Sequence, residues 1–395
     1  MNRKKIIIVA IIILTLTILV IVFWVARSKG NQGQIVSPGG FFPESGSGNI
    51  KVIPPNLLGK NGLIGGQNLA LTKLSLAPVS GAAYAEGQVI YVDRATGNMY
   101  KVNSDGSGRN RASNTTIPGI FESHFSAQGD NFILRYLSSD SGAESVRNFL
   151  AGFSGALSTT TAISIEGIFL PADISSSAIS PEENKIFYTY KQGEYTIGIT
   201  ADFQNKKQKQ VFSSPFGEWS VSWPSKNIIT LLTKPSGTAE GFFYSLDAKT
   251  GKFAKIIGGI NGLGAQIDKS GENVIYSEAG QNSLKASIYN LKKNEKNALP
   301  VSTFAEKCVF SYASVYVYCS VPINLPPALY PDEWYQGLVS FSDLIWKVNL
   351  SDMSTEILSG AENDFDATDS FLSSNEDYIF FTNKKDSSLW SLKLK

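Results

Sequence analysis

Short runs of β-branched and aromatic residues, separated by polar turns, recur along most of this chain. The clearest run occurs seven times, and first positions of successive runs lie 41 to 64 residues apart. The runs are residues 89–91, 132–134, 186–188, 228–230, 274–276, 315–317 and 379–381. Residues of these types favour strands, and a period of this length is typical of a repeat architecture.

Each run lies in the middle of a repeated unit. A small-residue strand and a turn precede the run, a third strand follows it, and a further turn leads to an outer strand such as residues 253–257. Four antiparallel strands in a unit of this length form a propeller blade. The sequence therefore predicts an all-β fold, a seven-bladed β-propeller over residues 68–395, with rings of six or eight blades as alternatives.

The seventh unit lacks an outer strand, because the sequence stops directly after its third strand, residues 389–392. Residues 69–76, ahead of the first unit, read as an outer strand without a blade of its own. Pairing this strand with the last blade would close the ring and remove its exposed edges. We therefore expect the propeller to be closed by its own N-terminal strand.

Residues 6–25 form an apolar stretch interrupted only by Thr15 and Thr17. As a helix it would rise about 30 Å, the thickness of a bilayer's hydrocarbon core. A cleaved secretory signal is the alternative, but its apolar region spans only about 7 to 15 residues, and Trp24 stands where cleavage needs a small side chain. We expect residues 1–27 to be a single transmembrane anchor.

The flanking charges predict the orientation of this anchor. Arg3, Lys4, Lys5 and the amino terminus precede the span, and Arg27 and Lys29 follow it. The positive-inside rule places the N-terminus in the cytoplasm and the propeller outside the cytoplasmic membrane. Residues 28–67, rich in Gly, Pro, Ser and Asn, read as a flexible linker between the two.

Composition and charge exclude several functions. The 395 residues are 43% hydrophobic, which is enough for a large core, and 35 Lys plus Arg against 34 Asp plus Glu give no field that would attract nucleic acid. His124 is the only histidine, which argues against a Ser-His-Asp hydrolase and against His-rich metal sites. No cofactor-binding motif is found. We expect no metal, no cofactor and no catalytic residue, and we expect His124 to be structural or exposed.

The two cysteines, Cys308 and Cys319, flank a predicted turn at Ala313 and Ser314. A two-residue turn there would place them opposite one another on the first and second strands of blade six. A disulfide outside the cell is one reading, and a pair of reduced, buried thiols is the other.

Blade six contains a Pro-rich insertion, residues 322–337, with an unusual density of aromatic and acidic side chains. Aromatic residues on a loop of a rigid scaffold suit recognition, so the candidate interaction residues are Tyr330, Asp332, Glu333, Trp334 and Tyr335. The alternative is that Trp334 and Tyr335 plug the gap between blades six and seven. The acidic pairs of this region, Asp332 with Glu333 and Asp364 with Asp366, are expected in solvated loops.

The turns before the second strands include Ser180-Pro181-Glu182-Glu183 and Ser270-Gly271-Glu272. These resemble the Ser-Pro-Asp-Gly turns of TolB-like and WD-repeat-like propellers, over roughly residues 69–395. The resemblance implies the propeller fold. The predicted anchor and the lack of an additional α/β domain depart from TolB, so its partners are not carried over.

Two functions follow from these observations. The first is a binding or scaffolding module of the cell envelope, tethered to the membrane, whose propeller face holds a protein, peptide or glycan. The second is an extracytoplasmic enzyme acting on glycans, a hydrolase or lyase, which would need acidic residues converging at the central channel of the ring. A further possibility is assembly into a larger envelope complex through the transmembrane helix.

Overall fold

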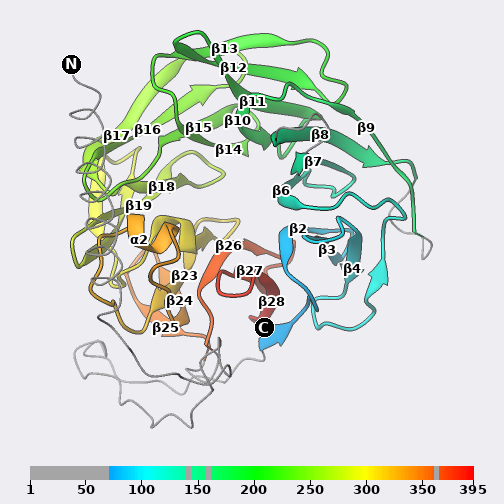
Figure 1. Ribbon diagram of the computed structural model, residues 1–395. Coiled ribbons are helices and arrows are strands. Elements are labelled where there is room, and N and C mark those ends of the chain that lie inside the picture. Colours follow the sequence, from blue (N-terminus) through cyan, green and yellow to red (C-terminus); the bar gives the residue numbers. More distant parts are fainter. Residues whose placement is uncertain (1–70, 139–143, 156–161, 360–363) are drawn as a thin grey trace, which may run out of the picture. The chain divides into compact units, whose positions relative to one another are not determined.

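The computed structural model describes residues 71–138, 144–155, 162–359 and 364–395 of the chain. These residues form seven four-stranded antiparallel sheets arranged in a ring (Figure 1). The predicted anchor, residues 1–27, and the predicted linker, residues 28–67, lie outside the described residues. Among the residues that are described, no helix has the length and apolar character needed to cross a membrane.

The strands follow one another blade by blade along the sequence. The first three blades are β2 (Val79–Ala85), β3 (Gln88–Asp93), β4 (Met99–Val102) and β5 (Asn110–Arg111); β6 (Ile120–Phe125), β7 (Asn131–Ser138), β8 (Ser145–Phe153) and β9 (Ile165–Phe169); and β10 (Ile174–Ile179), β11 (Lys185–Gln192), β12 (Tyr195–Asp202) and β13 (Lys209–Ser214). The fourth and fifth are β14 (Trp219–Ser225), β15 (Ile228–Thr233), β16 (Glu240–Asp247) and β17 (Phe253–Asn261); and β18 (Gly264–Ile267), β19 (Asn273–Gly280), β20 (Ser283–Asn290) and β21 (Glu295–Ala298). The sixth is β22 (Cys308–Phe310), β23 (Tyr316–Pro322), β24 (Asp343–Asn349) and β25 (Thr355–Ile357). The seventh joins β26 (Ala367–Leu372), β27 (Tyr378–Asn383) and β28 (Ser388–Lys393) to β1 (Leu71–Lys73).

All seven predicted runs fall on the second strands of the blades, and the predicted all-β, seven-bladed propeller is confirmed. The middle of each of these strands is buried, because both faces of a blade pack against neighbouring blades. The hydrophobic core accordingly lies between blades. One cluster, for example, joins Ile275 and Ile288 of blade five to Cys308, Val317 and Cys319 of blade six.

The ring is closed by the strand that precedes the first blade. β1 pairs antiparallel with β28, with Leu71 opposite Leu392 and Lys73 opposite Trp390. Leu74 extends the contact through a 2.8 Å hydrogen bond from its amide to the carbonyl of Leu389. The structure thus contains the expected pairing between the N-terminal strand and the last blade.

The antiparallel order of the strands divides the connections between two faces of the ring. One face carries the connections between successive blades and those between second and third strands, including the insertion of blade six; we call it the insertion face. The opposite face carries the connections between first and second and between third and fourth strands. β1 runs toward the insertion face, so the chain enters the described part at Leu71 on the opposite face.

Candidate functional site

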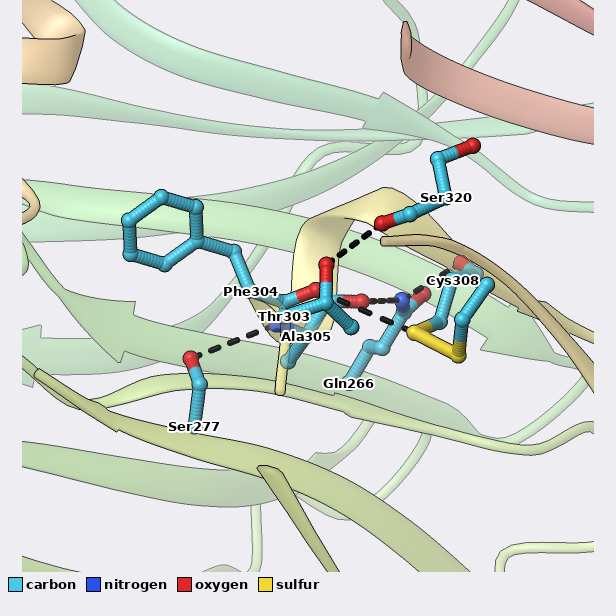
Figure 2. The surroundings of a disulfide bond; sticks show 8 residues. Gln266, Ser277, Thr303, Phe304, Ala305, Cys308 and Ser320 are labelled. Carbon is cyan, nitrogen blue, oxygen red and sulfur yellow. Dashed lines mark hydrogen bonds between the residues drawn. A yellow bond between two sulfur atoms is a disulfide. The ribbon is translucent and has the colours of Figure 1, made fainter. Parts of the chain in front are cut away.

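The two cysteines form a disulfide, with Sγ–Sγ 2.12 Å, between directly opposed positions of β22 and β23. The predicted bond is therefore present, and it joins the first two strands of blade six. Figure 2 shows the backbone that it holds: Gln266 donates a hydrogen bond to the carbonyl of Cys308 over 2.7 Å, and Ser277 accepts one from the amide of Ala305 over 3.2 Å. The short helix η2 (Ala305–Lys307) is fixed between blade five and the disulfide.

The insertion of blade six contacts neighbouring blades. It contains the short helix α2 (Asp332–Tyr335). Asp332 accepts hydrogen bonds from the hydroxyl of Ser236 over 2.8 Å and from the amide of Gly237 over 2.6 Å, both in blade four. Lys384, in blade seven, donates one to the carbonyl of Trp334 over 2.7 Å. The insertion is thus fixed at both sides, across blades four to seven.

The aromatic residues of the insertion are mostly internal. Tyr330 and Trp334 are buried in a cluster with Phe304 and Phe341, and the rings of Phe304 and Trp334 stack with centroids 4.8 Å apart. The indole nitrogen of Trp334 donates a hydrogen bond to Asp366, on the connection between blades six and seven. Trp334 is therefore an internal side chain, packed in a cluster that includes residues of blade five and hydrogen-bonded to the connection before blade seven.

The five candidate interaction residues therefore differ in how far their side chains are exposed to solvent. Tyr330 and Trp334 are buried, whereas Asp332 and Glu333 are half-buried. Glu333 accepts a hydrogen bond from the amide of Leu329 over 2.9 Å, within the insertion itself. Tyr335 is 38% exposed, so it is the member of this group that a partner can touch directly.

A fully buried ion-pair network lies next to Trp334. The ammonium group of Lys307 lies 2.6 Å from a carboxylate oxygen of Asp343 and 2.5 Å from one of Asp366, and all three side chains are inaccessible to solvent. Burial raises the pKa of Asp343, although Lys307 opposes the shift. The expectation of a solvated loop is therefore wrong for Asp366. Asp366 is buried because it pairs with Lys307 and accepts a hydrogen bond from the indole nitrogen of Trp334.

Near the ring axis, acidic side chains from different blades come together. Glu306 on η2 interacts electrostatically with Asp369 on β26, and Asp369 in turn with Glu122 and His124 on β6. We call Glu122, Glu306 and Asp369 the axial carboxylates. Glu122 and Asp369 lie on the first strands of blades two and seven, and Glu306 lies on η2, directly before the first strand of blade six.

Glu306 is held by Tyr335, whose hydroxyl donates a hydrogen bond to Oε1 of Glu306 over 2.6 Å. Burial raises the pKa of Glu306 to about 7, and the nearby charge of Asp369 adds to the shift. Burial also raises the pKa of Asp369. Both residues are exposed at the surface, although the protein atoms packed around them disfavour the charged form.

Glu122 has the opposite electrostatic character. Burial alone would raise its pKa, but His124, 2.7 Å away, and Arg135, 2.5 Å away, outweigh burial and lower the pKa to about 2. Arg135 is itself buried, and it donates further hydrogen bonds to Asn148 and to the carbonyl of Ile174. His124, half-exposed as Glu122 is, therefore belongs to an ion-pair network. The axial carboxylates thus include a strongly acidic group and a weakly acidic one.

Sequence reasoning missed the axial carboxylates. Glu122 is close in sequence to the single histidine, but Glu306 and Asp369 belong to no local motif and come from the start of blade six and the first strand of blade seven. Across the described ranges, no group of three or more His, Cys, Asp and Glu side chains has the arrangement needed to hold a metal ion.

Exposed apolar side chains are concentrated on one face. Twelve large apolar residues are exposed in the part of the chain that the structure describes, and nine of them lie in connections or strand ends of the insertion face. These nine are Leu76, Leu137, Ile168, Phe169, Tyr195, Phe216, Leu325, Tyr335 and Leu338. Phe253, Tyr312 and Val315 lie at the opposite face.

Comparison with known proteins identifies the fold of the chain. No protein-family model and no curated protein matches the sequence. An oligogalacturonate lyase in complex with manganese is structurally similar, with a TM-score of 0.56 at 9% identity over 84% of this chain and 96% of the lyase. An oligogalacturonate lyase from Vibrio parahaemolyticus gives 0.54 at 10% identity, over 83% and 94%. TolB from Acinetobacter baumannii gives 0.43 at 11% identity, over 78% of this chain and 64% of TolB.

At such low identity the two lyases show the fold alone. Their likeness spans most of this chain and nearly all of each lyase, and it agrees with the seven four-stranded sheets observed directly. The predicted resemblance to known propellers is confirmed at that level. The chain is a seven-bladed β-propeller, and what it binds must be inferred from its own surface.

Proposed function

We propose that this protein is a membrane-tethered, extracytoplasmic propeller that binds a protein, peptide or glycan partner through its insertion face. The observation that carries the proposal is the gathering of nine of the twelve exposed large apolar residues on that face. Exposed apolar side chains cost free energy in water that a partner can recover, so the face that carries most of them is the better candidate for binding.

The path of the chain supports the choice of face. β1 begins at the opposite face, so the chain enters the described propeller away from the insertion face. The charges that flank the apolar segment support an extracytoplasmic propeller.

The insertion supplies a rigid platform for binding. Asp332 is fixed to blade four and Trp334 to blade seven by the hydrogen bonds described above. A partner that meets Tyr335 therefore does not have to order a mobile loop, which reduces the entropic cost of association.

Photocrosslinking of the full-length protein in its native membranes tests the proposal. We expect Leu325→Ser combined with Leu338→Ser to abolish capture of a partner, because both side chains are exposed on the insertion face. Phe253→Ser combined with Val315→Ser is the matched control on the opposite face and should leave capture intact. Equal capture by both variants would refute binding through the insertion face. Deletion of the whole insertion is a poorer test, because it removes the buried Tyr330 and Trp334.

The axial carboxylates favour a second candidate, an enzyme acting on glycans. Glycoside hydrolysis uses one carboxylic acid with a raised pKa and one ionised carboxylate, and Glu306 and Glu122 have these characters. Release of reducing ends from oligogalacturonates and other polysaccharides by the full-length protein tests this candidate. Activity that survives both Glu306→Gln and Glu122→Gln would exclude the axial carboxylates as its source.

A further inference from the structure

We propose that the face opposite the insertion face lies against the anionic headgroups of a phospholipid membrane, and that lysines at the outer edges of blades three to five make the contact. The inference rests on the proposed function, because it states how the membrane-tethered propeller is oriented. Two independent observations carry it: a band of exposed lysines on that face, and the point where the chain enters the propeller.

The lysines lie in three successive connections between third and fourth strands. These connections are residues 203–208 of blade three, 248–252 of blade four and 291–294 of blade five, and we call them the lysine hairpins. Each contains two lysines and no acidic residue. The six lysines are all exposed: Lys206, Lys207, Lys249, Lys252, Lys292 and Lys293.

The remaining blades do not repeat this charge pattern. The equivalent connections of blades one and six are residues 103–109 and 350–354, which together hold one arginine and two aspartates. In blades three to five the positive charge also continues into the outer strands, at Lys209, Lys255 and Lys296. The excess of positive charge is therefore a property of one sector of the face.

Packing between blades brings the three hairpins together. The ammonium group of Lys209, directly after the hairpin of blade three, donates a 2.6 Å hydrogen bond to the carbonyl of Lys249 in the hairpin of blade four. Leu291, in the hairpin of blade five, packs against a cluster that contains Ile257 of blade four. The lysines therefore form one band across three neighbouring blades.

The protein itself does little to neutralise this band. Within the part of the chain that the structure describes, Lys292 is the only one of the six lysines with a carboxylate oxygen within 4.0 Å, from Glu272 at 3.6 Å. Asp202 and Asp247, at the ends of the preceding strands, accept hydrogen bonds from backbone amides of their own turns. An exposed cationic surface of this kind attracts anions.

The extent of the band indicates the kind of anion. It spans three blades, so a small anion would reach only part of it, whereas a surface of many anionic headgroups can contact all three hairpins at once. Phe253, 41% exposed, follows Lys252 and stands on the ring of Phe212 with centroids 5.2 Å apart. An aromatic side chain beside basic ones suits the boundary between lipid headgroups and acyl chains.

The point of chain entry favours a membrane over a soluble polyanion. Leu71, the first described residue, lies on the same face as the lysine hairpins, at the outer edge of blade seven. The predicted span, residues 6–25, precedes it in the sequence. Blade seven lies across the ring from blades three and four (Figure 1). Chain entry and positive charge therefore occupy opposite sides of one face, and a bilayer that meets both leaves the insertion face toward solvent.

Energy transfer to lipid tests the inference. The full-length protein is reconstituted into nanodiscs of phosphatidylcholine, either alone or with one third phosphatidylglycerol, each containing a headgroup-labelled acceptor lipid. A donor dye is attached to Gln208→Cys in the hairpin of blade three, and Cys308 and Cys319 do not compete for the dye because they are joined. We expect about twofold more transfer in the anionic nanodiscs. The increase should vanish in 1 M NaCl, where the Debye length is about 3 Å.

A matched pair of variants separates the hairpins from charge in general. The hairpin variant removes one lysine from each hairpin, by Lys206→Gln, Lys249→Gln and Lys293→Gln, and should reduce transfer to the level seen in phosphatidylcholine. The control removes three exposed lysines at the insertion-face ends of their strands, by Lys191→Gln, Lys234→Gln and Lys285→Gln, and should retain the increase. Both variants should unfold at the same temperature as the wild type, because every replaced side chain is exposed.

The outcomes separate this inference from the proposed function. Equal transfer in the two nanodiscs, or an increase that survives in the hairpin variant, would overturn the inference and leave binding through the insertion face standing. Binding of soluble polyphosphate by the wild type but not by the hairpin variant, without the lipid-dependent increase, would also overturn it and assign the lysines to a soluble polyanion. Failure of the full-length protein to enter either nanodisc would refute the proposed tethering and this inference together. Capture that persists in the Leu325→Ser and Leu338→Ser variant would refute only binding through the insertion face.

Discussion

The indole nitrogen of Trp334 lies 2.8 Å from a carboxylate oxygen of Asp366, and the other oxygen of that carboxylate lies 2.5 Å from the ammonium group of Lys307. The insertion, the connection before blade six and the connection before blade seven therefore meet at one buried carboxylate. Because Asp343 binds the same Lys307, a single cation pairs with two buried acids. The integrity of the insertion face depends on that cation.

Replacing Lys307 by Met should strongly destabilise the protein. It leaves two buried carboxylates without a cation, and breaking a buried pair in this way costs about 3 to 5 kcal/mol. Denaturant unfolding measures the loss. Lys234→Met is the control, because its pair with Glu218 is exposed on both sides and such pairs contribute about 0 to 1 kcal/mol. Equal losses for the two variants would contradict the burial argument.

Glu306 should make stability fall with rising pH. Its folded-state pKa of about 7 lies above the ordinary value of 4.5, so the folded protein binds the proton more tightly than the unfolded chain. The stability that Glu306 contributes is therefore fully present below about pH 4.5 and is lost as the pH rises through 7. Glu306→Gln should make the melting temperature less sensitive to pH between 5 and 8. A difference between wild type and variant that stays constant over this range would contradict the raised pKa.

Glu122 should affect acid stability in the opposite sense. Its pKa is lowered to about 2 in the folded protein, so its ion pairs stabilise the fold above about pH 4.5 and are lost as the pH falls toward 2. Glu122→Gln should be less stable than wild type at pH 6, and the gap should narrow by pH 3. Urea unfolding at the two pH values tests this, and a gap that widens in acid would contradict it.

Loss of the disulfide should weaken blade six. Replacing both Cys308 and Cys319 by Ser should cost about 2 to 4 kcal/mol, the usual range for a native crosslink. Thermal unfolding with and without a reductant checks the value, since the reductant should lower the stability of wild type but leave the double variant unchanged. An equal response of both proteins to the reductant would contradict this prediction.

The fold was predictable because its signal is local. A second strand enclosed on both sides must be apolar throughout, and residues 89–91 or 379–381 show this within three positions. The disulfide was within reach for the same reason, because the distance of each cysteine from a tight turn sets the register of the two strands. Both the repeat period and the position of a turn can be read from the amino-acid sequence.

The site was not predictable because its parts come from different blades and meet only in the folded propeller. Glu306 precedes the first strand of blade six and Asp369 lies within the first strand of blade seven, and nothing near either residue in the sequence marks it. Asp366 illustrates the same limit. Its neighbours suggested a solvated loop, and its burial depends on Lys307, which is remote in the sequence.

Closure of the ring by β1 has a mechanical consequence. Leu71 is the first described residue and is itself paired with β28, so tension applied through the preceding segment acts first on the three residue pairs that close the propeller. Peeling β1 away would expose the edge of blade seven and detach Leu74 from the core that blade seven shares with blade one. The strength of these three residue pairs therefore sets the force that the domain withstands before the ring opens.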